Sequence, residues 1–213
     1  MIRKSAHRSK HQFDHQRILV AQEAARIIHE TGLTDFKAAK SKAAENLGLI
    51  NQGALPSNYE IASAVEEHGR IFFAEDQDWR LNLQRETALY VMHNLCSFKP
   101  RLVGSVLSGQ VSEHSPIELH LYSDTSENVG MWLDAHGVIY QTKSRRHTIQ
   151  KGRTEMFPVY QFSEEDCLVH TTVFPERRPH APICPVNGKP MQRAGIRDLE
   201  QLLEQPKLAQ LAR

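Results

Sequence analysis

Two polar residues, Glu118 and His120, lie two positions apart in an apolar run at 117–122 that is typical of a β-strand. Because side chains alternate along a strand, Glu118 and His120 are expected to point to the same face. A second strand-like run, just before a polar loop, contains Gly104 and Ser105. A small Gly-Ser turn facing a pair of polar strand residues is a layout that can hold a phosphorylated ligand and a metal ion.

The elements that must position these residues follow a change of pattern at Pro100. From there the apolar residues come in short runs, which indicates strands separated by loops. One helix is expected among the strands and another after a long Pro-rich loop, so we expect an α+β region with a mixed sheet. The expected strands cover 102–107, 117–122, 138–141, 157–162 and 168–174, and the expected helices cover 126–136 and 196–204.

The first hundred residues have helical periodicity instead. Apolar residues recur at spacings of three and four, and Ser57 and Glu60 have the spacing of a capping box at the start of one helix. We therefore expect an α+β protein with a helical region at 1–98, of which 1–12 is a disordered basic arm, and an α+β domain at 99–213. The expected helices of the first region cover about 13–31, 36–48, 57–72 and 76–97.

Bulk composition excludes some classes of protein. The chain has 213 residues and a net charge of +1, so charge alone indicates neither a nucleic acid nor an acidic membrane as a partner. Its three cysteines form no CxxC pair, which favours a reducing, cytoplasmic environment over a disulfide framework. No apolar run approaches the roughly 18 residues that a membrane span needs. There is no P-loop, GxGxxG, GxSxG or HExxH motif.

Residues 99–175 resemble the nucleotidyltransferase fold of the polymerase-beta superfamily, as a divergent member of bacterial type. Small members of that superfamily have a helix, a strand ending in Gly-Ser, and then a strand with two carboxylates separated by one residue. Val103-Gly104-Ser105 matches the first part. Glu118 falls at the position of the first carboxylate, and the strand order expected here is also similar.

The resemblance implies a site for a nucleotide. Gly104 would let the backbone approach a phosphate, and Ser105 would donate hydrogen bonds to it. Carboxylates of active members hold Mg²⁺ ions, which activate the attacking hydroxyl. At the corresponding positions this chain has Glu118, His120 and His170, which are therefore the candidate catalytic and metal-binding residues. No organic cofactor is indicated.

The two histidines stand where the superfamily has carboxylates, and three interpretations stay open. The pocket can bind a nucleotide without chemistry. It can use Mg²⁺ or Mn²⁺, or a transition metal if His120 and His170 are ligands, because imidazole suits such metals better than Mg²⁺. Alternatively, other acids nearby, Asp124 and those at 164–166, can supply the missing carboxylates.

Two basic segments are candidates for contact with phosphate. The loop at 175–194 has Asn187-Gly188 at a tight turn. Residues 142–153 are strongly basic and are interpreted as a solvated, hairpin-like loop. The cations of the first segment that can bind a nucleotide are Arg177, Arg178, Lys189 and Arg193.

We therefore expect a cytoplasmic, nucleotidyltransferase-like protein that binds a nucleotide or another phosphorylated ligand. It would be a transferase that moves a nucleotidyl group to RNA, a protein or a small molecule. The alternative is an inactive nucleotidyltransferase fold that binds RNA or a protein partner. A third interpretation is a helical domain joined to an antiparallel sheet without that fold.

Overall fold

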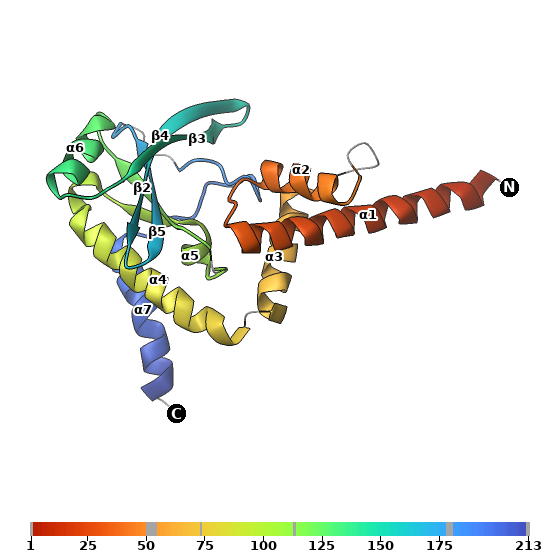
Figure 1. Cartoon of the computed structure of the whole chain (residues 1–213), viewed down its shortest axis with the longest axis horizontal. Coiled ribbons are helices and arrows are strands. Elements are labelled where there is room, and N and C mark those ends of the chain that lie inside the picture. Colours follow the sequence, from red (N-terminus) through yellow and green to blue (C-terminus); the bar gives the residue numbers. More distant parts are fainter. Residues whose placement is uncertain (1, 50–54, 73, 113, 178–180, 212–213) are drawn as a thin grey trace. The chain divides into compact units, whose positions relative to one another are not determined.

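The computed structural model describes residues 2–49, 55–72, 74–112, 114–177 and 181–211 of the chain. The chain divides into two compact units, Met1–Glu75 with Ser112–His114, and Asp76–Val111 with Ser115–Arg213. Figure 1 labels helices and strands of both units where there is room. Among the described residues, no helix has both the length and the apolar character required to cross a membrane.

The first unit is helical and contains α1 (Ile2–Thr31), α2 (Phe36–Asn46) and α3 (Asn58–Phe72). Alanines make up much of its core, so the helices can approach one another closely. The predicted capping box is confirmed: Ser57 N donates to Glu60 Oε2 over 2.7 Å, and Glu60 N donates to Ser57 Oγ over 3.2 Å. The buried residues of the unit's core are Val20, Ala21, Ala24, Ile27, Ala39, Ala43, Ala44 and Ile61.

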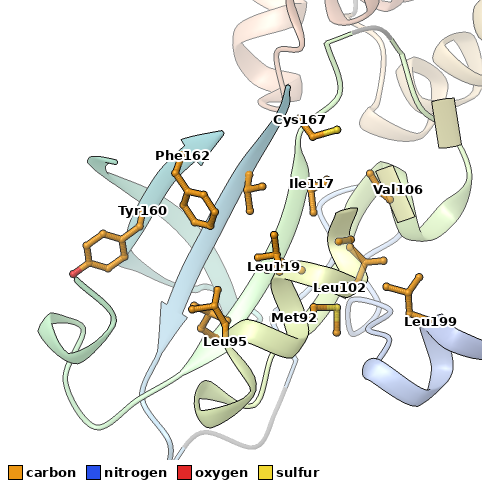
Figure 2. Packing of buried hydrophobic residues seen from close by; sticks show 14 of the residues in the cluster. Met92, Leu95, Leu102, Val106, Ile117, Leu119, Tyr160, Phe162, Cys167 and Leu199 are labelled. Carbon is orange, nitrogen blue, oxygen red and sulfur yellow. The ribbon is translucent and has the colours of Figure 1, made fainter. Parts of the chain in front are cut away.

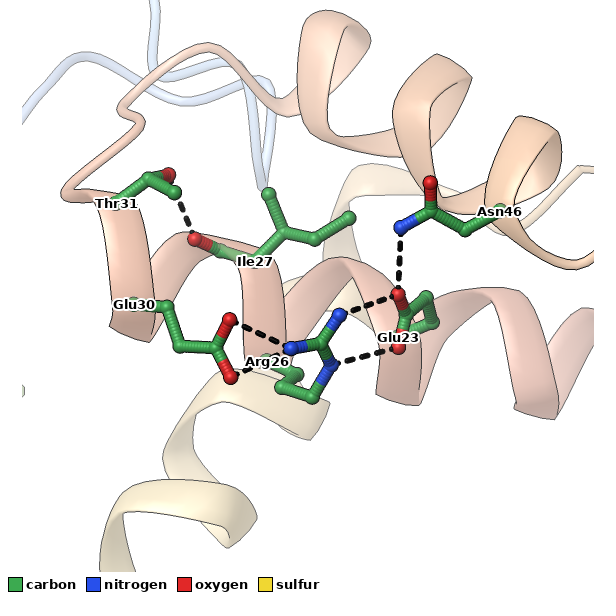
Figure 3. Close-up of polar contacts among 6 residues, drawn as sticks. All are labelled: Glu23, Arg26, Ile27, Glu30, Thr31 and Asn46. Carbon is green, nitrogen blue, oxygen red and sulfur yellow. Dashed lines mark hydrogen bonds and ion pairs between the residues drawn. The ribbon is translucent and has the colours of Figure 1, made fainter.

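A polar network joins α1 to α2 on the surface of this unit (Figure 3). Arg26 donates to Glu30 over 2.5 Å and to Glu23 over 2.8 Å, and Asn46 of α2 donates to Glu23 over 2.8 Å. These hydrogen bonds, the one from Arg26 above all, lower the pKa of Glu23 to about 2. Glu23 is therefore charged at neutral pH and links the two helices.

The second unit contains a mixed five-stranded sheet with the order β1-β2-β5-β4-β3. β2 and β5 are parallel, and the other neighbouring strands are antiparallel. Helices followed by this mixed sheet confirm the predicted α+β class. The strands are β1 (Arg101–Val103), β2 (Ile117–Tyr122), β3 (Gln141–Gln150), β4 (Arg153–Glu164) and β5 (Cys167–Phe174).

One face of the sheet is packed against helices (Figure 2). α4 (Ala74–Asn94) and α7 (Ile196–Leu211) contribute apolar side chains to this core, together with α6 (Glu127–Ala135). The odd-numbered residues of β2 are fully buried there, which leaves its even-numbered residues for the other face. The core includes Met92, Leu95, Leu102, Val106, Ile117, Leu119, Val129, Tyr160, Phe162 and Leu199.

The predicted strand at 102–107 is wrong beyond Val103. The chain turns into the short helix α5 (Gly104–Ser108) instead. The reason is local: Gly104 has φ of 73°, which ends an extended strand. Arg85 of α4 then donates to the carbonyl oxygens of Val106 over 3.2 Å and Leu107 over 3.4 Å, so it holds the end of α5.

The predicted strand at 138–141 begins only at Gln141, and the predicted hairpin-like excursion at 142–153 is a hairpin of two regular strands, β3 and β4, instead of a loop. The sequence did not predict β3 as a strand, because its residues are largely polar or charged and it contains no apolar run. Its pattern is one of alternation, in which Lys143, Arg145 and His147 share one face while Ser144 and Arg146 share the other.

Two further boundaries differ between sequence and structure. The structure starts α1 at Ile2, within the stretch predicted as a disordered arm, and no Gly or Pro interrupts the sequence before Gly32. The predicted domain boundary at 98 falls after α4; Met92 of that helix and Leu95, just after it, pack in the core of the sheet.

Candidate ligand-binding face

The face of the sheet opposite α4 carries polar side chains from four adjacent strands. The register pairs Glu118 with His170 across β2 and β5, and His170 with Gln161 across β5 and β4. We call this surface the polar face. Its members are Glu118, His120 and Tyr122 of β2, His170, Thr172 and Phe174 of β5, Phe157, Val159 and Gln161 of β4, and Lys143, Arg145 and His147 of β3.

Gly104 and Glu118 meet at one edge of the polar face. A Cβ atom placed on Gly104 would lie 2.1 Å from Glu118 Oε2, and Gly104 also has a positive φ of 73°. Only glycine meets both demands without strain. The sequence predicted that the Gly-Ser turn and Glu118 belong to one site. The structure places Gly104 of this turn next to Glu118.

Glu118 forms an ion pair with Arg145 of β3. The Glu118 residue is only 9% exposed, and Arg145 Nη1 donates to its Oε1. A buried carboxylate needs such a partner, because desolvation of an unpaired charge costs several kcal/mol. Arg145 thus provides the positive charge that compensates the carboxylate of Glu118.

His170 lies beside Glu118 but bonds to a different residue. The Gln161 amide Nε2 donates a hydrogen bond to Nε2 of His170 over 2.8 Å, so this imidazole nitrogen is the acceptor. Burial lowers the pKa of His170, partly offset by Glu118. The side chain is therefore neutral at pH 7 and occupied by a side-chain hydrogen bond.

His120 is 2% exposed and packs in an aromatic cluster. Its ring centroid lies 4.7 Å from that of Phe174 and 5.5 Å from that of His147. Burial is the main cause that lowers the pKa of His120, and His147 and nearby arginines lower it further. Its Nδ1 atom is buried and has no hydrogen-bond partner among the residues that the structure describes. An unsatisfied buried nitrogen costs about 1–3 kcal/mol.

His147 is the residue of this face that sequence reasoning missed most completely. It is 8% exposed, and burial lowers its pKa to about 4. Within the described part of the chain its Nε2 has no hydrogen-bond partner. Arg145 and Lys143 were likewise assigned to a loop. The alternation of long polar side chains at 143, 145 and 147 was the signal that could have placed all three on one face of a strand.

The segment at 181–195, which we call the strap, connects the two edges of the sheet. Ile183 bridges Thr148 of β3, and Ala194 bridges Leu102 of β1. Next to the second bridge, Arg193 Nη1 donates to the Tyr122 hydroxyl over 2.6 Å, so the strap brings a cation to the polar face. Arg193, Leu107 of α5 and Asp198 of α7 also line a pocket of about 480 Å³.

The other predicted phosphate contacts lie elsewhere. Ser105 is half-buried at the start of α5, next to Gly104. Lys189 is exposed at the tight turn of the strap, where its N–H donates to Asn187 Oδ1 over 2.9 Å. Arg177 is exposed before the strap, and Arg178 lies outside the described residues. Of the predicted phosphate-binding cations, Arg193 is the one for which a hydrogen bond to the polar face is found.

The predicted metal ligands fit a pair of Mg²⁺ ions poorly. Mg²⁺ prefers oxygen ligands, whereas Glu118 already binds Arg145 and the neighbouring positions carry imidazoles. Within the described ranges, no group of three or more His, Cys, Asp and Glu side chains is arranged to hold a metal ion.

Comparison of the chain with protein-family models, with curated proteins and with solved structures finds no match.

Proposed function

We propose that this chain is a cytoplasmic protein that binds a nucleotide or a similar phosphorylated small molecule on the polar face. The observation that carries the proposal is the ion pair between Glu118 and Arg145 next to Gly104. It places a guanidinium where the resemblance to nucleotidyltransferases implies metal-bound phosphates. Arginine matches the geometry of phosphate oxygens and needs no metal to do so.

The charge balance of the polar face supports an anionic ligand. Lys143 and Arg145 approach it from β3, and Arg193 approaches it from the strap. Glu118 is compensated by Arg145, and Glu155 of β4, opposite His147, is compensated by Arg153. Because His120 and His147 are neutral at pH 7, the face has an excess of positive charge.

Binding, more than transfer, is the function that these side chains support. Nucleotidyl transfer in the resembled superfamily uses carboxylates to hold metal ions, whereas the described carboxylates of this face, Glu118 and Glu155, are each paired with an arginine. We therefore propose a nucleotide-binding module, with transfer to an acceptor as an activity that the same assay can detect.

The experiment measures the binding of labelled ATP, with and without Mg²⁺ or Mn²⁺, to wild type and to two neighbouring variants. Arg145→Ala removes a cation from the polar face, whereas Arg146→Ala removes an exposed cation from the opposite face of the same strand. We expect Arg145→Ala to weaken binding at least tenfold and Arg146→Ala to leave it within twofold. Equal effects of the two variants, or no binding by the folded wild type, would contradict the proposal.

Glu118→Gln separates an ion-pair role from a metal-ligand role. If Glu118 compensates Arg145, the variant frees the guanidinium and binding of ATP without metal becomes tighter or stays equal. If Glu118 holds a metal ion, the metal-dependent part of the binding and any label transfer are lost. Binding of RNA in place of the free nucleotide would favour the alternative of an RNA-binding module.

A further inference from the structure

The outer strand of the sheet, β3, has an edge that the protein leaves largely open. β3 is the last strand of the order β1-β2-β5-β4-β3, and β4 pairs with it on one side. On its other side the strap contributes a bridge from Ile183 to Thr148. Along residues 141–147, no strand that the structure describes covers this other side of β3.

The direction of the backbone groups of β3 follows from its pairing. In an antiparallel strand, the N–H and C=O groups of one residue point to the same side, and successive residues alternate between the two sides. The carbonyl of Thr148 accepts from Ile183 N over 2.7 Å, so Thr148 points away from β4. The register is regular from Gln141 to Thr148, so the other even-numbered residues point away as well. Opposite Ser144 lies Pro158, which has no N–H to donate, in agreement with this direction.

Three residues before Thr148 present such outward groups to solvent. They are Thr142, Ser144 and Arg146, and all three are exposed. Within the described ranges, no residue outside β4 forms a hydrogen bond with their backbone N–H and C=O groups. A row of such groups is a template for one more strand, because each donor and each acceptor finds a partner there. The strap already uses this edge at Thr148, which shows that the edge accepts an extended chain.

The side chains along this edge are basic. Lys143 and Arg146 are exposed and lie on opposite faces of β3. Neither has an ion pair with a described side chain, whereas Arg145 between them is paired with Glu118. A strand added to this edge therefore meets a positive charge on each of its two faces.

These charges decide between the candidate occupants of the edge. In a pair of two β3 strands, basic side chains would lie opposite basic side chains, which is destabilising. Lysine and arginine on an edge strand thus disfavour its pairing with a second copy. A nucleic acid would match the charge, but phosphate oxygens only accept hydrogen bonds and would leave the carbonyl groups of the edge without donors. An acidic polypeptide in an extended conformation matches both the charges and the backbone groups.

We propose that the open edge of β3 binds an extended acidic segment of a partner protein, which adds to the sheet as a further strand. The backbone of the segment forms hydrogen bonds with Thr142, Ser144 and Arg146. Its side chains alternate between the two faces of the sheet, so the acids that meet Lys143 and Arg146 are three positions apart. This interaction does not rest on the proposed nucleotide site, because it uses the outward backbone groups of the edge.

An apolar neighbour on one face adds to the expected pattern of the segment. Met156 of β4 lies opposite Arg146 and is 56% exposed, and Pro158 lies opposite Ser144 on the same face. Because serine is small, an apolar side chain placed opposite Ser144 can reach over it to Met156 and Pro158. The segment should therefore have an apolar residue two positions from the acid that meets Arg146.

The first measurement is an NMR titration of the isotopically labelled full chain with a synthetic peptide, Thr-Glu-Thr-Val-Glu-Val, blocked at both ends. In an antiparallel arrangement, like that of the strap, its two acids match Lys143 and Arg146 and its central valine lies opposite Ser144. The control peptide has lysine in place of both glutamates. We expect the glutamate peptide to bind at least tenfold more tightly at low ionic strength, with a smaller difference when salt is added.

Hydrogen exchange of single amides tests the geometry of the complex. In the free protein, the amides of Lys143 and Arg145 point to β4 and should exchange slowly, whereas those of Ser144 and Arg146 point outward and should exchange fast. Saturating glutamate peptide should slow exchange of the outward amides at least tenfold and leave the inward amides within twofold. Outward amides that stay fast in the complex would contradict the proposal.

Two variants of one residue separate backbone pairing from side-chain contact. Ser144→Pro removes an outward N–H without breaking a hydrogen bond to β4, and Ser144→Ala is the matched control that keeps this N–H. We expect Ser144→Pro to weaken binding of the glutamate peptide at least tenfold and Ser144→Ala to leave it within twofold. Arg146→Glu should bind the lysine peptide more tightly than the glutamate peptide. Circular dichroism and thermal unfolding establish that each variant is folded, and the exchange pattern of the wild type decides the question if Ser144→Pro is not.

Several outcomes overturn the proposal. Equal affinity for the two peptides, no binding of the glutamate peptide by the folded wild type, or equal binding by wild type and folded Ser144→Pro would each do so. Self-association that Ser144→Pro abolishes, measured by sedimentation velocity, would assign the edge to a second copy of the chain. Oligouridine that displaces the peptide and binds wild type and Ser144→Pro equally would assign the cations to RNA. A wild type that binds the glutamate peptide but no ATP overturns the proposed nucleotide function and leaves the edge site standing.

Discussion

Gly104 and Glu118 are so close that the carboxylate occupies the space in which a side chain at position 104 would begin. Oε2 of Glu118 would lie 2.1 Å from that Cβ atom. Glu118 cannot easily withdraw, because Arg145 holds its other oxygen. The Gly-Ser turn and the ion pair therefore form one unit, and a change at any of these three residues should be felt at the other two.

Substitution of Gly104 by alanine is expected to lower stability by about 3 kcal/mol or more. Part of this, about 1–2 kcal/mol, is the cost of a positive φ for an L-residue. The matched control is Gly152→Ala, because Gly152 has φ of 78° and nothing within 4 Å of its Cβ position. Chemical denaturation of both variants measures the difference. Equal losses for the two would show that contact with Glu118 carries no cost.

Stability is expected to fall as the pH drops from about 6.5 to about 4. The pKa of His147 in the folded protein is lowered to about 4 by burial, while the unfolded chain has the ordinary value near 6.5. In this window the unfolded state binds more protons, so acid favours unfolding, on the order of 2–3 kcal/mol from His147. Burial also lowers the pKa of His120, which acts in the same direction.

Urea unfolding at pH 7 and pH 4.5 tests this pH dependence. His147→Phe should remove a large part of the difference, since phenylalanine has no proton to gain. His93→Gln is the control, because the His93 side chain is 55% exposed. A pH dependence that is the same in wild type and His147→Phe would place its origin in other groups.

We expect that a substitution in the turn between β4 and β5 can raise the stability of the protein. Glu165 and Asp166 have positive φ values of 46° and 62°, a conformation that two-residue hairpins usually fill with Asn-Gly. Asp166→Gly should therefore raise stability by about 0.5–1 kcal/mol, measured as a higher denaturation midpoint. Asp166→Ala removes the same carboxylate but keeps the strain, so a gain in both variants would refer the effect to charge and not to backbone conformation.

The three cysteines are expected to react at different rates with a thiol reagent. Cys96 is exposed, whereas Cys167 is buried and burial raises its pKa, which lowers the fraction of reactive thiolate. We expect Cys96 to be the fastest reacting thiol of the native protein, so the Cys96→Ser variant should lack the fast phase of the reaction. Cys167 should react only when the protein unfolds. Peptide mass mapping after a short pulse of iodoacetamide identifies the modified residue. Early labelling of Cys167 would contradict the packing of β5 against α4.

The sequence predicts best those elements in which apolar residues recur at the regular spacing of a strand or a helix. The strand at Ile117–Tyr122 alternates cleanly between core and polar face, so both its limits and the shared face of Glu118 and His120 follow from the sequence. The strand Gln141–Gln150 could not be found in this way, because it lies at the edge of the sheet and its side chains are mostly polar. The sequence therefore did not predict the partner of Glu118, because Arg145 lies on β3, which β5 and β4 separate from β2 in the sheet.

His147 shows the same limit at the level of a single residue. Its neighbours in sequence are basic and suggest solvent, yet its ring packs against Phe157 and Phe174 from two other strands. Burial of a polar side chain depends on these non-local contacts, and local composition does not contain them. The strap could be predicted only in part. Its prolines indicate a stiff connection, but they do not indicate which two strands it joins.

The strap pairs with one residue of each edge strand, through the bridges from Ala194 to Leu102 and from Ile183 to Thr148. β1 and β3 are the edge strands, and unpaired edges are templates for association with other chains. Because the strap comes late in the sequence and joins strands far apart in the chain, it can dock only after the sheet has formed. A nascent or truncated chain that ends before Ile183 would expose both edges and should associate with copies of itself.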